Sequence, residues 1–230
     1  MPSKRFKKAL ELVDTKKTYP LKTAVDVLSK FPKAKFNETI DLAFRLGVDP
    51  KQSDQMVRGT VPLPHGSGKT VKVLVFAKNG AAAEAAKAAG AEFVGFDDLI
   101  KKCNEGWSDF DVAIATPEAM SEVRKLGKVL GPRGLMPNPK TGTVTEDTAK
   151  AVKEVKAGRV EFKIDKAGNV HVPIGKASFA ATQLEENARA VMDAVAKARP
   201  HTMKGTYVNS CTISATMSPP VRVDIKEFLI

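Results

Sequence analysis

The stretch at residues 63–70, LPHGSGKT, ends in the letters GKT in the manner of a phosphate-binding loop. Such a loop begins with a glycine, follows a strand and opens a helix, because the N–H groups at the helix start hold the phosphate. Here Leu63 replaces the first glycine, and the apolar run that suits a strand, residues 71–77, follows the motif instead of preceding it. We therefore predict a hinge or turn between two domains, and a nucleotide-binding enzyme is the weaker alternative.

The other residues with catalytic potential form no known constellation. The histidines, at positions 65, 171 and 201, lack the spacing of metal ligands, and no Gly-x-Ser-x-Gly elbow occurs. The acidic pairs at 97–98 and 185–186 lie at expected helix starts, where capping and the helix dipole explain them. We therefore predict no catalytic residue, no metal site, no cofactor and no enzymatic activity.

The segment 206–218, TYVNSCTISATMS, carries hydroxyl groups at alternate positions. Alternate residues of a strand share a face, and a hydroxyl-rich face suits phosphates and ribose hydroxyls because serine and threonine both donate and accept hydrogen bonds. A solvated sheet face is the structural alternative. The hydroxyl face would hold Val208, Ser210, Thr212, Ser214, Thr216 and Ser218. The other face would hold Cys211, Ile213, Ala215 and Met217.

The strands that we expect beside this segment are also basic and polar outside. Their outward residues are Lys35, Thr39, Lys163, Lys166 and His171. Phe36 is the single aromatic residue among them, so the stacking platform of single-strand binders is missing. The pattern therefore favours folded RNA, and no recognition helix or dimer signal favours DNA.

A glycine- and proline-rich stretch, GKVLGPRGLMPNPKTGTV at residues 127–144, leaves its role open. It holds four glycines, three prolines and three basic residues without a carboxylate. We interpret it as a basic surface segment in which Gly131, Gly134 and Gly142 allow tight turns. Arg133 and Lys140 are candidate secondary RNA contacts, and bracing of the loop is an equally good account.

The element pattern divides the chain into two domains of an α/β (α+β) fold. Residues 67–158 alternate strands with helices, one of them capped by Asp97, which predicts a parallel sheet in a small α/β domain. The flanks, 1–66 and 159–230, show an alternating strand at 35–48, a hairpin at 159–174 and a helix capped by Thr182. We expect them to form one discontinuous domain with an antiparallel sheet, into which the middle is inserted.

Charge is concentrated in the flanks. The chain has a net charge of +11, with 13 Lys/Arg against 7 Asp/Glu in residues 1–66 and 10 against 7 in residues 159–230. The middle has 14 against 12. Clustered lysine and arginine side chains bind a nucleic acid favourably because they release the counterions condensed on its phosphates. The discontinuous domain is therefore the better candidate for binding nucleic acid.

The remaining composition indicates a soluble cytoplasmic protein. The two cysteines, Cys103 and Cys211, lie far apart and outside any Cys-x-x-Cys pair, which fits a reducing compartment. No apolar run is long enough for a signal peptide or for the ~18 residues of a membrane-spanning helix. We therefore expect no membrane partner.

Several long stretches together resemble the ribosomal protein L-one family, the stalk proteins of the large ribosomal subunit, in their bacterial form. They are LGKVLGPRGLMPNPKTGTV, LGVDPKQSDQMVRGTVPLPHGSGK, KAGRVEFKIDKAGNVHVPIGKASF and ATMSPPVRVD. The resemblance covers nearly the whole chain, as far as Asp224. It implies a discontinuous two-layer α/β domain with an inserted three-layer Rossmann-like domain, in a protein that is a monomer within the ribosome.

The resemblance also implies partners and contact residues. The partners would be a folded region of large-subunit rRNA, the mRNA of the protein's own operon in a feedback repressor role, and deacylated tRNA near the exit site. The implied RNA contacts are Lys35, Phe36, Thr39, Lys163, Lys166, His171, Ser210, Ser214, Thr216, Met217 and Ser218. At Ser218 the bacterial pattern has glycine, so this position departs from the family. A general nucleic-acid chaperone without a preferred target is the third alternative.

Overall fold

The computed structural model describes residues 3–78 and 80–226, apart from the side chains of Ser53 and Lys140. The chain divides into two compact units, of which unit 1 comprises Met1–Gly68 and Gly158–Ile230 and unit 2 comprises Lys69–Ala157. These borders lie two residues after and one residue before those expected from the sequence. Each unit has its own buried apolar core, and each is described by itself.

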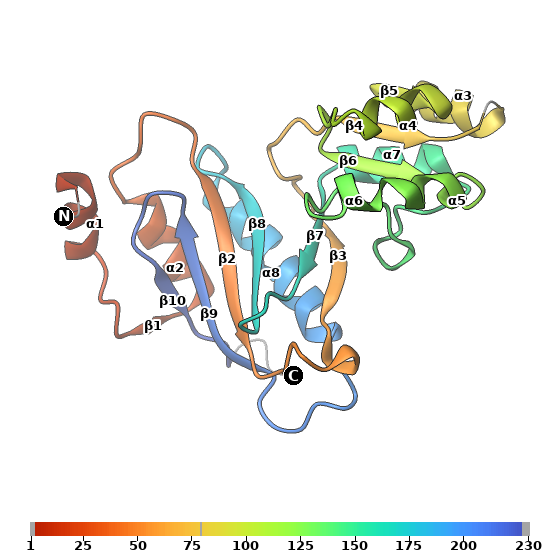
Figure 1. Cartoon of the computed structure of the whole chain (residues 1–230). Coiled ribbons are helices and arrows are strands. Elements are labelled where there is room, and N and C mark those ends of the chain that lie inside the picture. Colours follow the sequence, from red (N-terminus) through yellow and green to blue (C-terminus); the bar gives the residue numbers. More distant parts are fainter. Residues whose placement is uncertain (1–2, 79, 227–230) are drawn as a thin grey trace. The chain divides into compact units, whose positions relative to one another are not determined.

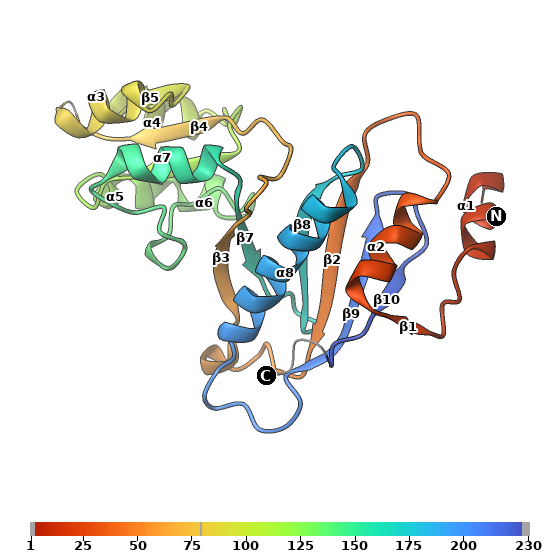
Figure 2. The ribbon, with the colours of Figure 1, turned by 180° about the vertical axis from the view of Figure 1, so that it is seen from behind.

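Unit 1 is built around an antiparallel sheet with the strand order β1-β10-β9-β2-β8, in which only the short β1–β10 pairing is parallel. Helices α2 and α8 lie on one side of this sheet (Figure 1), and the view from behind shows them in front of it (Figure 2). The elements are α1 Lys4–Glu11, β1 Thr18–Tyr19, α2 Leu21–Ser29, β2 Thr39–Leu46, η1 Ser53–Gln55, β3 Arg58–Pro62, β7 Arg159–Lys163, β8 Asn169–Lys176, α8 Ala181–Lys197, β9 Val208–Ala215 and β10 Val221–Val223.

The two-residue period of the strands produces this covered face. Leu42 of β2 lies opposite Val172 of β8 and Ile213 of β9, and all three side chains are fully buried against the helical side. The helices supply the matching apolar stripe, with Val25 on α2 and Val191 on α8 in the same core. The predicted antiparallel sheet with helices behind it is therefore confirmed.

The predicted hairpin at 159–174 is confirmed only next to its turn, where Ile164 pairs with Val170. Strand β7, before that point, pairs instead with β3 in a separate two-stranded sheet. Gly59 explains this choice of partner, because a Cβ atom there would lie 2.7 Å from the ring of Phe162 on the paired strand. The glycine lets that ring lie across β3, which fixes the β3–β7 register.

Unit 2 has three layers, because its parallel sheet β5-β4-β6 is covered by helices on both faces. Leu74 and Phe76 face the core under α4, α5 and α6, whereas Val73 and Val75 face the core under α3 and α7. The elements are β4 Val73–Phe76, α3 Ala81–Ala88, β5 Phe93–Gly95, α4 Asp97–Asn104, β6 Val112–Ala115, α5 Met120–Val123, η2 Arg124–Leu126, α6 Gly127–Leu130, η3 Pro139–Thr141 and α7 Thr148–Lys156. The predicted α/β fold class is confirmed.

Two predicted helix caps are displaced by one or two residues. Helix α4 begins at Asp97 with Phe96 as its N-cap, so Asp97 acts through the dipole of the first turn and not as the cap. Helix α8 begins after Ala180, whose N–H donates to the Gln183 side chain at 3.1 Å. The Gln183 side chain therefore satisfies the N–H of the residue before the helix, and no side chain provides the cap that we expected from Thr182.

Candidate nucleic-acid interface

The face of the unit 1 sheet opposite α2 and α8 carries polar side chains on neighbouring strands. On β9, Ser210, Thr212 and Ser214 are partly or fully exposed, whereas the residues between them are buried. Thr212 lies opposite Arg222 of β10 and Ala43 of β2, so the polar surface extends from β9 to β10 and is interrupted by an alanine on β2. We call it the open face. Its members are Asp41, Arg45, His171, Ser210, Thr212, Ser214 and Arg222.

Val208, which we predicted on the same face as Ser210, points into the core instead. The register between β2 and β9 shifts after the Arg45–Ser210 pair, so that Leu46 pairs with Val208. This irregularity places Val208 in the core and leaves Asn209 exposed, which period-two alternation cannot anticipate.

Two arginines, Arg45 on β2 and Arg222 on β10, outnumber the half-buried carboxylate of Asp41 on the open face. His171 on β8 adds an imidazole ring to the same surface. Burial raises the pKa of Asp41, and the nearby charges of His171 and Lys176 partly oppose that rise. The face is therefore suited to an anionic partner at neutral pH.

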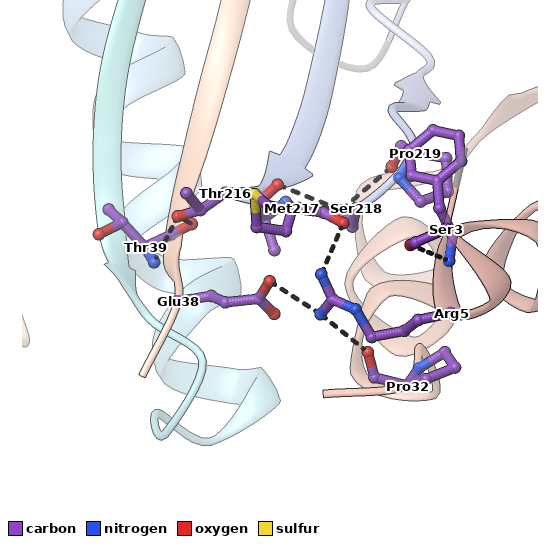
Figure 3. A network of polar contacts seen from close by, with 11 residues as sticks. Ser3, Arg5, Pro32, Glu38, Thr39, Thr216, Met217, Ser218 and Pro219 are labelled. Carbon is purple, nitrogen blue, oxygen red and sulfur yellow. Dashed lines mark hydrogen bonds and ion pairs between the residues drawn. The ribbon is translucent and has the colours of Figure 1, made fainter. Parts of the chain in front are cut away.

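Hydrogen bonds between two threonines fix one end of the sheet, where β2 begins and β9 ends (Figure 3). The Thr39 N–H donates to the Thr216 hydroxyl at 3.0 Å, and that hydroxyl donates to the Thr39 carbonyl at 3.2 Å. The Lys176 ammonium donates to the Thr39 hydroxyl at 2.8 Å. These bonds hold three chain segments together before any partner binds, so the end of the sheet is preorganised.

Two large apolar side chains are exposed next to this threonine pair. Phe36, just before β2, is 54% exposed, and Met217, in the turn after β9, is 55% exposed. Ser218 completes that turn, since its hydroxyl accepts from the Ala215 N–H at 2.9 Å and donates to the turn's own carbonyls. The Ser218 side chain therefore stabilises the turn. Exposed apolar groups on a rigid polar surface are typical of binding sites.

The structure brings together most of the residues that the resemblance implied, but not all of them. Lys35, Phe36, Thr39, Thr216, Met217 and Ser218 lie at the β2 start, and His171, Ser210 and Ser214 lie on the open face. Lys163 belongs to the β3–β7 sheet, where it pairs with Arg58, so its expected place in the same sheet as the segment 206–218 is wrong. Lys166 lies in the turn before β8, at the end of the sheet where β2 finishes.

Sequence reasoning omitted Thr212, Lys176, Arg45 and Arg222 from the site. Thr212 was on the predicted hydroxyl face, and Arg45 was on the outward side of its strand, so the alternation alone could have selected both. Lys176 could not be found in this way, because a register shift between Ile40 and Asp41 sets its pairing with Thr39.

Unit 2 gives little support to a nucleotide site. The GSGKT motif precedes β4, and Lys69 forms a 2.5 Å ion pair with Asp111. A pocket of about 240 Å³ does lie where β4 and β6 end, lined by Lys78 at one side. Glu118 and Glu146 also line it, and their carboxylates oppose the binding of phosphates.

The glycine- and proline-rich stretch at 127–144 is partly helical and braces unit 2. Its first residues form α6, which includes Gly131 as a helical C-cap with φ of −59° and not as a tight turn. Leu130 is fully buried, and the Asn138 N–H donates to the Thr143 hydroxyl at 2.8 Å. The exposed Arg133 guanidinium donates to the Ser108 hydroxyl, and the Lys140 side chain lies outside the described residues.

Within the described ranges, no group of His, Cys, Asp and Glu is arranged to hold a metal ion. In the same part of the chain, no helix has the length and apolar character needed to cross a membrane.

One comparison with known proteins bears on this surface. The model of the ribosomal protein L1p/L10e family matches residues 28–219, which span the central parallel sheet and nearly all of the open face. That family consists of RNA-binding constituents of the ribosome and not of enzymes. The match covers far more than half of the sequence, so the chain belongs to the ribosomal protein L1p/L10e family and is a large-subunit ribosomal protein that binds rRNA.

Proposed function

We propose that unit 1 binds a folded region of large-subunit rRNA with the open face and with the end of the sheet at Thr39 and Thr216. The single observation that carries this proposal is the pair of exposed apolar side chains, Phe36 and Met217, on a surface already fixed by hydrogen bonds. A stacked or wedged base would bury them, and the neighbouring groups would contact its backbone.

The chemistry of the surrounding residues supports this division of roles. Arg45 and Arg222 would contact phosphates, because cations gain free energy by displacing the counterions of RNA, and the His171 ring would hydrogen-bond to the RNA beside them. The hydroxyls of Ser210, Thr212 and Ser214 would contact ribose and phosphate oxygens. With Phe36 as the only exposed aromatic side chain described at this surface, the RNA would be recognised mainly by its shape and sugar edge.

We further propose that the protein forms the mobile stalk of cytoplasmic ribosomes and assists the release of deacylated tRNA from the exit site. Family membership and the chain-long resemblance support this role. Arg133 of unit 2, and Lys140 in the same stretch, are proposed as secondary contacts with RNA, although bracing within unit 2 accounts equally well for Arg133.

A repressor role would use the same surface. We propose that the mRNA of the protein's own operon folds into a structure similar to the rRNA target and competes for unit 1. Free protein would then bind the message only when rRNA is saturated, which gives feedback on translation.

Salt-dependent binding tests the proposal. Binding of the full chain to a stalk fragment of large-subunit rRNA would be titrated with salt beside an unrelated RNA hairpin of equal length. We expect tighter binding to the rRNA fragment and a preference that persists as salt rises, because a shaped site adds contacts beyond charge. Equal affinities that fall together would instead indicate a general nucleic-acid chaperone.

Competition tests the repressor role separately. The operon mRNA leader should displace the labelled rRNA fragment from the protein, and unlabelled hairpin should not. Simultaneous binding of both RNAs would contradict the shared surface.

A further inference from the structure

The Arg5 side chain joins three segments that are remote in sequence (Figure 3). One guanidinium nitrogen, Nη1, donates to the Glu38 carboxylate at 3.3 Å and to the Pro32 carbonyl at 3.4 Å. The other nitrogen, Nη2, donates to the Met217 carbonyl at 3.2 Å. Arg5 thereby connects helix α1 to the loop before β2 and to the turn after β9.

The partner of Arg5 is a buried acid. Glu38 is only 5% exposed, although it directly precedes Thr39 of the interface. A buried carboxylate is strongly destabilised without a cation and hydrogen-bond donors. The Glu38 backbone is also fixed, since its carbonyl accepts from the Ala177 N–H at 2.8 Å. The Arg5–Glu38 pair therefore anchors the segment that presents Phe36.

The same guanidinium acts on the opposite segment. The Met217 carbonyl accepts from Arg5, whereas the Met217 side chain is 55% exposed, so Arg5 holds the backbone of the residue that presents this thioether to the surface. A planar guanidinium can donate hydrogen bonds to several acceptors at fixed angles from three nitrogen atoms. A lysine ammonium donates from one nitrogen atom only. Arginine is thus the side chain that this three-way junction requires.

We propose that Arg5 is a positioning residue of the RNA interface: from behind, it sets the backbone of Phe36–Thr39 and of Thr216–Ser218 without contacting the RNA itself. This inference rests on the proposed RNA-binding function of that surface. Its donors point inward to protein acceptors, so its effect on RNA is exerted through Glu38 and Met217. Helix α1 then belongs to the binding unit as a support, and Ser3 secures the helix start by accepting from the Phe6 N–H at 3.2 Å.

The test compares two substitutions that preserve charge. Arg5→Lys keeps the positive charge but loses the junction. Arg189→Lys makes the same chemical change on α8, where the arginine forms an ion pair with Glu185 one helical turn away. For the rRNA fragment, we expect Arg5→Lys to weaken binding by roughly tenfold or more, which corresponds to ~1.4 kcal/mol or more. Arg189→Lys should bind like the parent protein.

The salt slope separates positioning from contact. If Arg5 positions other groups, the slope of log K against log salt should stay unchanged in Arg5→Lys. A contact with phosphate would instead be revealed by a slope that falls in magnitude by roughly 0.7–0.9 in Arg5→Ala, and that result would overturn the proposal. Affinity of Arg5→Lys equal to the parent would overturn it as well.

A measurement on the free protein keeps this inference distinct from the proposed function. The ¹³C-methyl NMR signal of Met217 should shift in Arg5→Lys and in Glu38→Gln, but not in Arg189→Lys. An unmoved signal in Arg5→Lys would overturn the positioning role even if the protein binds rRNA as proposed. If the parent protein shows no preference for rRNA while the Met217 signal shifts in Arg5→Lys, the proposed rRNA-binding function is contradicted, whereas the positioning of Met217 by Arg5 is supported.

Discussion

The sheets of the two units differ in how many of their faces are exposed to solvent. In unit 2 the parallel strand β4 is buried at all four positions, because helices cover both of its faces. In unit 1 the antiparallel strand β2 alternates buried with partly exposed residues, because helices cover only one face. A sheet with one free face can present side chains at fixed spacing to a large partner, so unit 1 and not unit 2 offers an extended recognition surface.

The units also differ in how their exposed ends are held. At the start of β2, Arg5, Lys176 and Thr216 bind groups of neighbouring segments and immobilise the surface. In unit 2, the pocket at the ends of β4 and β6 is lined by Glu118 and Glu146 as well as Lys78. Carboxylates at that pocket disfavour an anionic partner, whereas the fixed end of the unit 1 sheet offers hydroxyl groups and apolar side chains to one.

The largest expected effect comes from breaking the core of one unit. Leu74→Ala in unit 2 should cost about 2–5 kcal/mol of that unit's stability, because Leu74 is fully buried. Each unit contains one buried cysteine, Cys103 in unit 2 and Cys211 in unit 1, so thiol labelling of the native protein reports on both. Labelling of Cys103 should accelerate strongly, while that of Cys211 and the affinity for rRNA should stay near parental values.

Leu42→Ala in unit 1 is the matched control, since Leu42 is equally buried. It should reverse the pattern, with faster labelling of Cys211 and weaker binding of rRNA. If Leu74→Ala abolished rRNA binding as strongly as Leu42→Ala, the assignment of recognition to unit 1 would be wrong.

The second effect concerns the exposed apolar side chains. Phe36→Ala should weaken rRNA binding by ~1–3 kcal/mol, the usual contribution of a base stacked on an aromatic ring. Met217→Ala should weaken it less, because a thioether has no ring face. Isothermal titration with the rRNA fragment would measure both.

Met56→Ala provides the control for this effect. Met56 is 53% exposed, nearly the same as Met217, but it lies next to Val57 near the other end of the sheet. Its replacement should leave the affinity unchanged. A loss as large as that of Met217→Ala would mean that general apolar adhesion, and not the threonine end of the sheet, binds the RNA.

Much of this fold follows from local patterns in the sequence. Alternation at Ile40, Leu42 and Phe44 correctly separates the covered face of β2 from its open face. The apolar run at β4 correctly predicts a doubly covered strand, since a helix-covered parallel strand needs no polar face. These elements are predictable because their periodicity is decided by residues close in sequence.

The sequence-based predictions fail where contacts between residues remote in sequence determine the structure. Lys163 was assigned to the wrong sheet because its strand, β7, pairs with β3. Gly59 on β3 makes room for the Phe162 ring of β7 and so favours this pairing. No role for Glu38 was predicted from the sequence, and its burial depends on Arg5, which is 33 residues away. No periodic signal joins Arg5 to Met217 across 212 residues, so the junction behind the interface emerges only from the structure.

A smaller effect is expected at the threonine pair. Thr216→Val removes the hydroxyl that bridges to the backbone of Thr39, which should lower the stability of unit 1 by about 1 kcal/mol. The looser end of the sheet should also weaken rRNA binding, measured against Thr23→Val at an exposed position of α2, outside the proposed interface. Equal affinities of Thr216→Val and the parent protein would remove Thr216 from the site.

The smallest effect distinguishes two carboxylates of unit 1 by the sign of their pH dependence. Burial raises the pKa of Asp41, so the stability that this group contributes is present below its unfolded pKa and is lost as pH rises through the folded pKa. Asp41→Asn should therefore gain stability relative to the parent as pH rises from the acid range to neutrality.

Hydrogen bonds from the Asn169 and Ala167 N–H groups lower the pKa of Asp165, so its contribution is present above the unfolded pKa and is lost as pH falls. Asp165→Asn should accordingly lose stability relative to the parent over the same rise in pH. Labelling of Cys211 in denaturant at several pH values would measure both, and equal signs for the two variants would contradict the half-buried position of Asp41 on the open face.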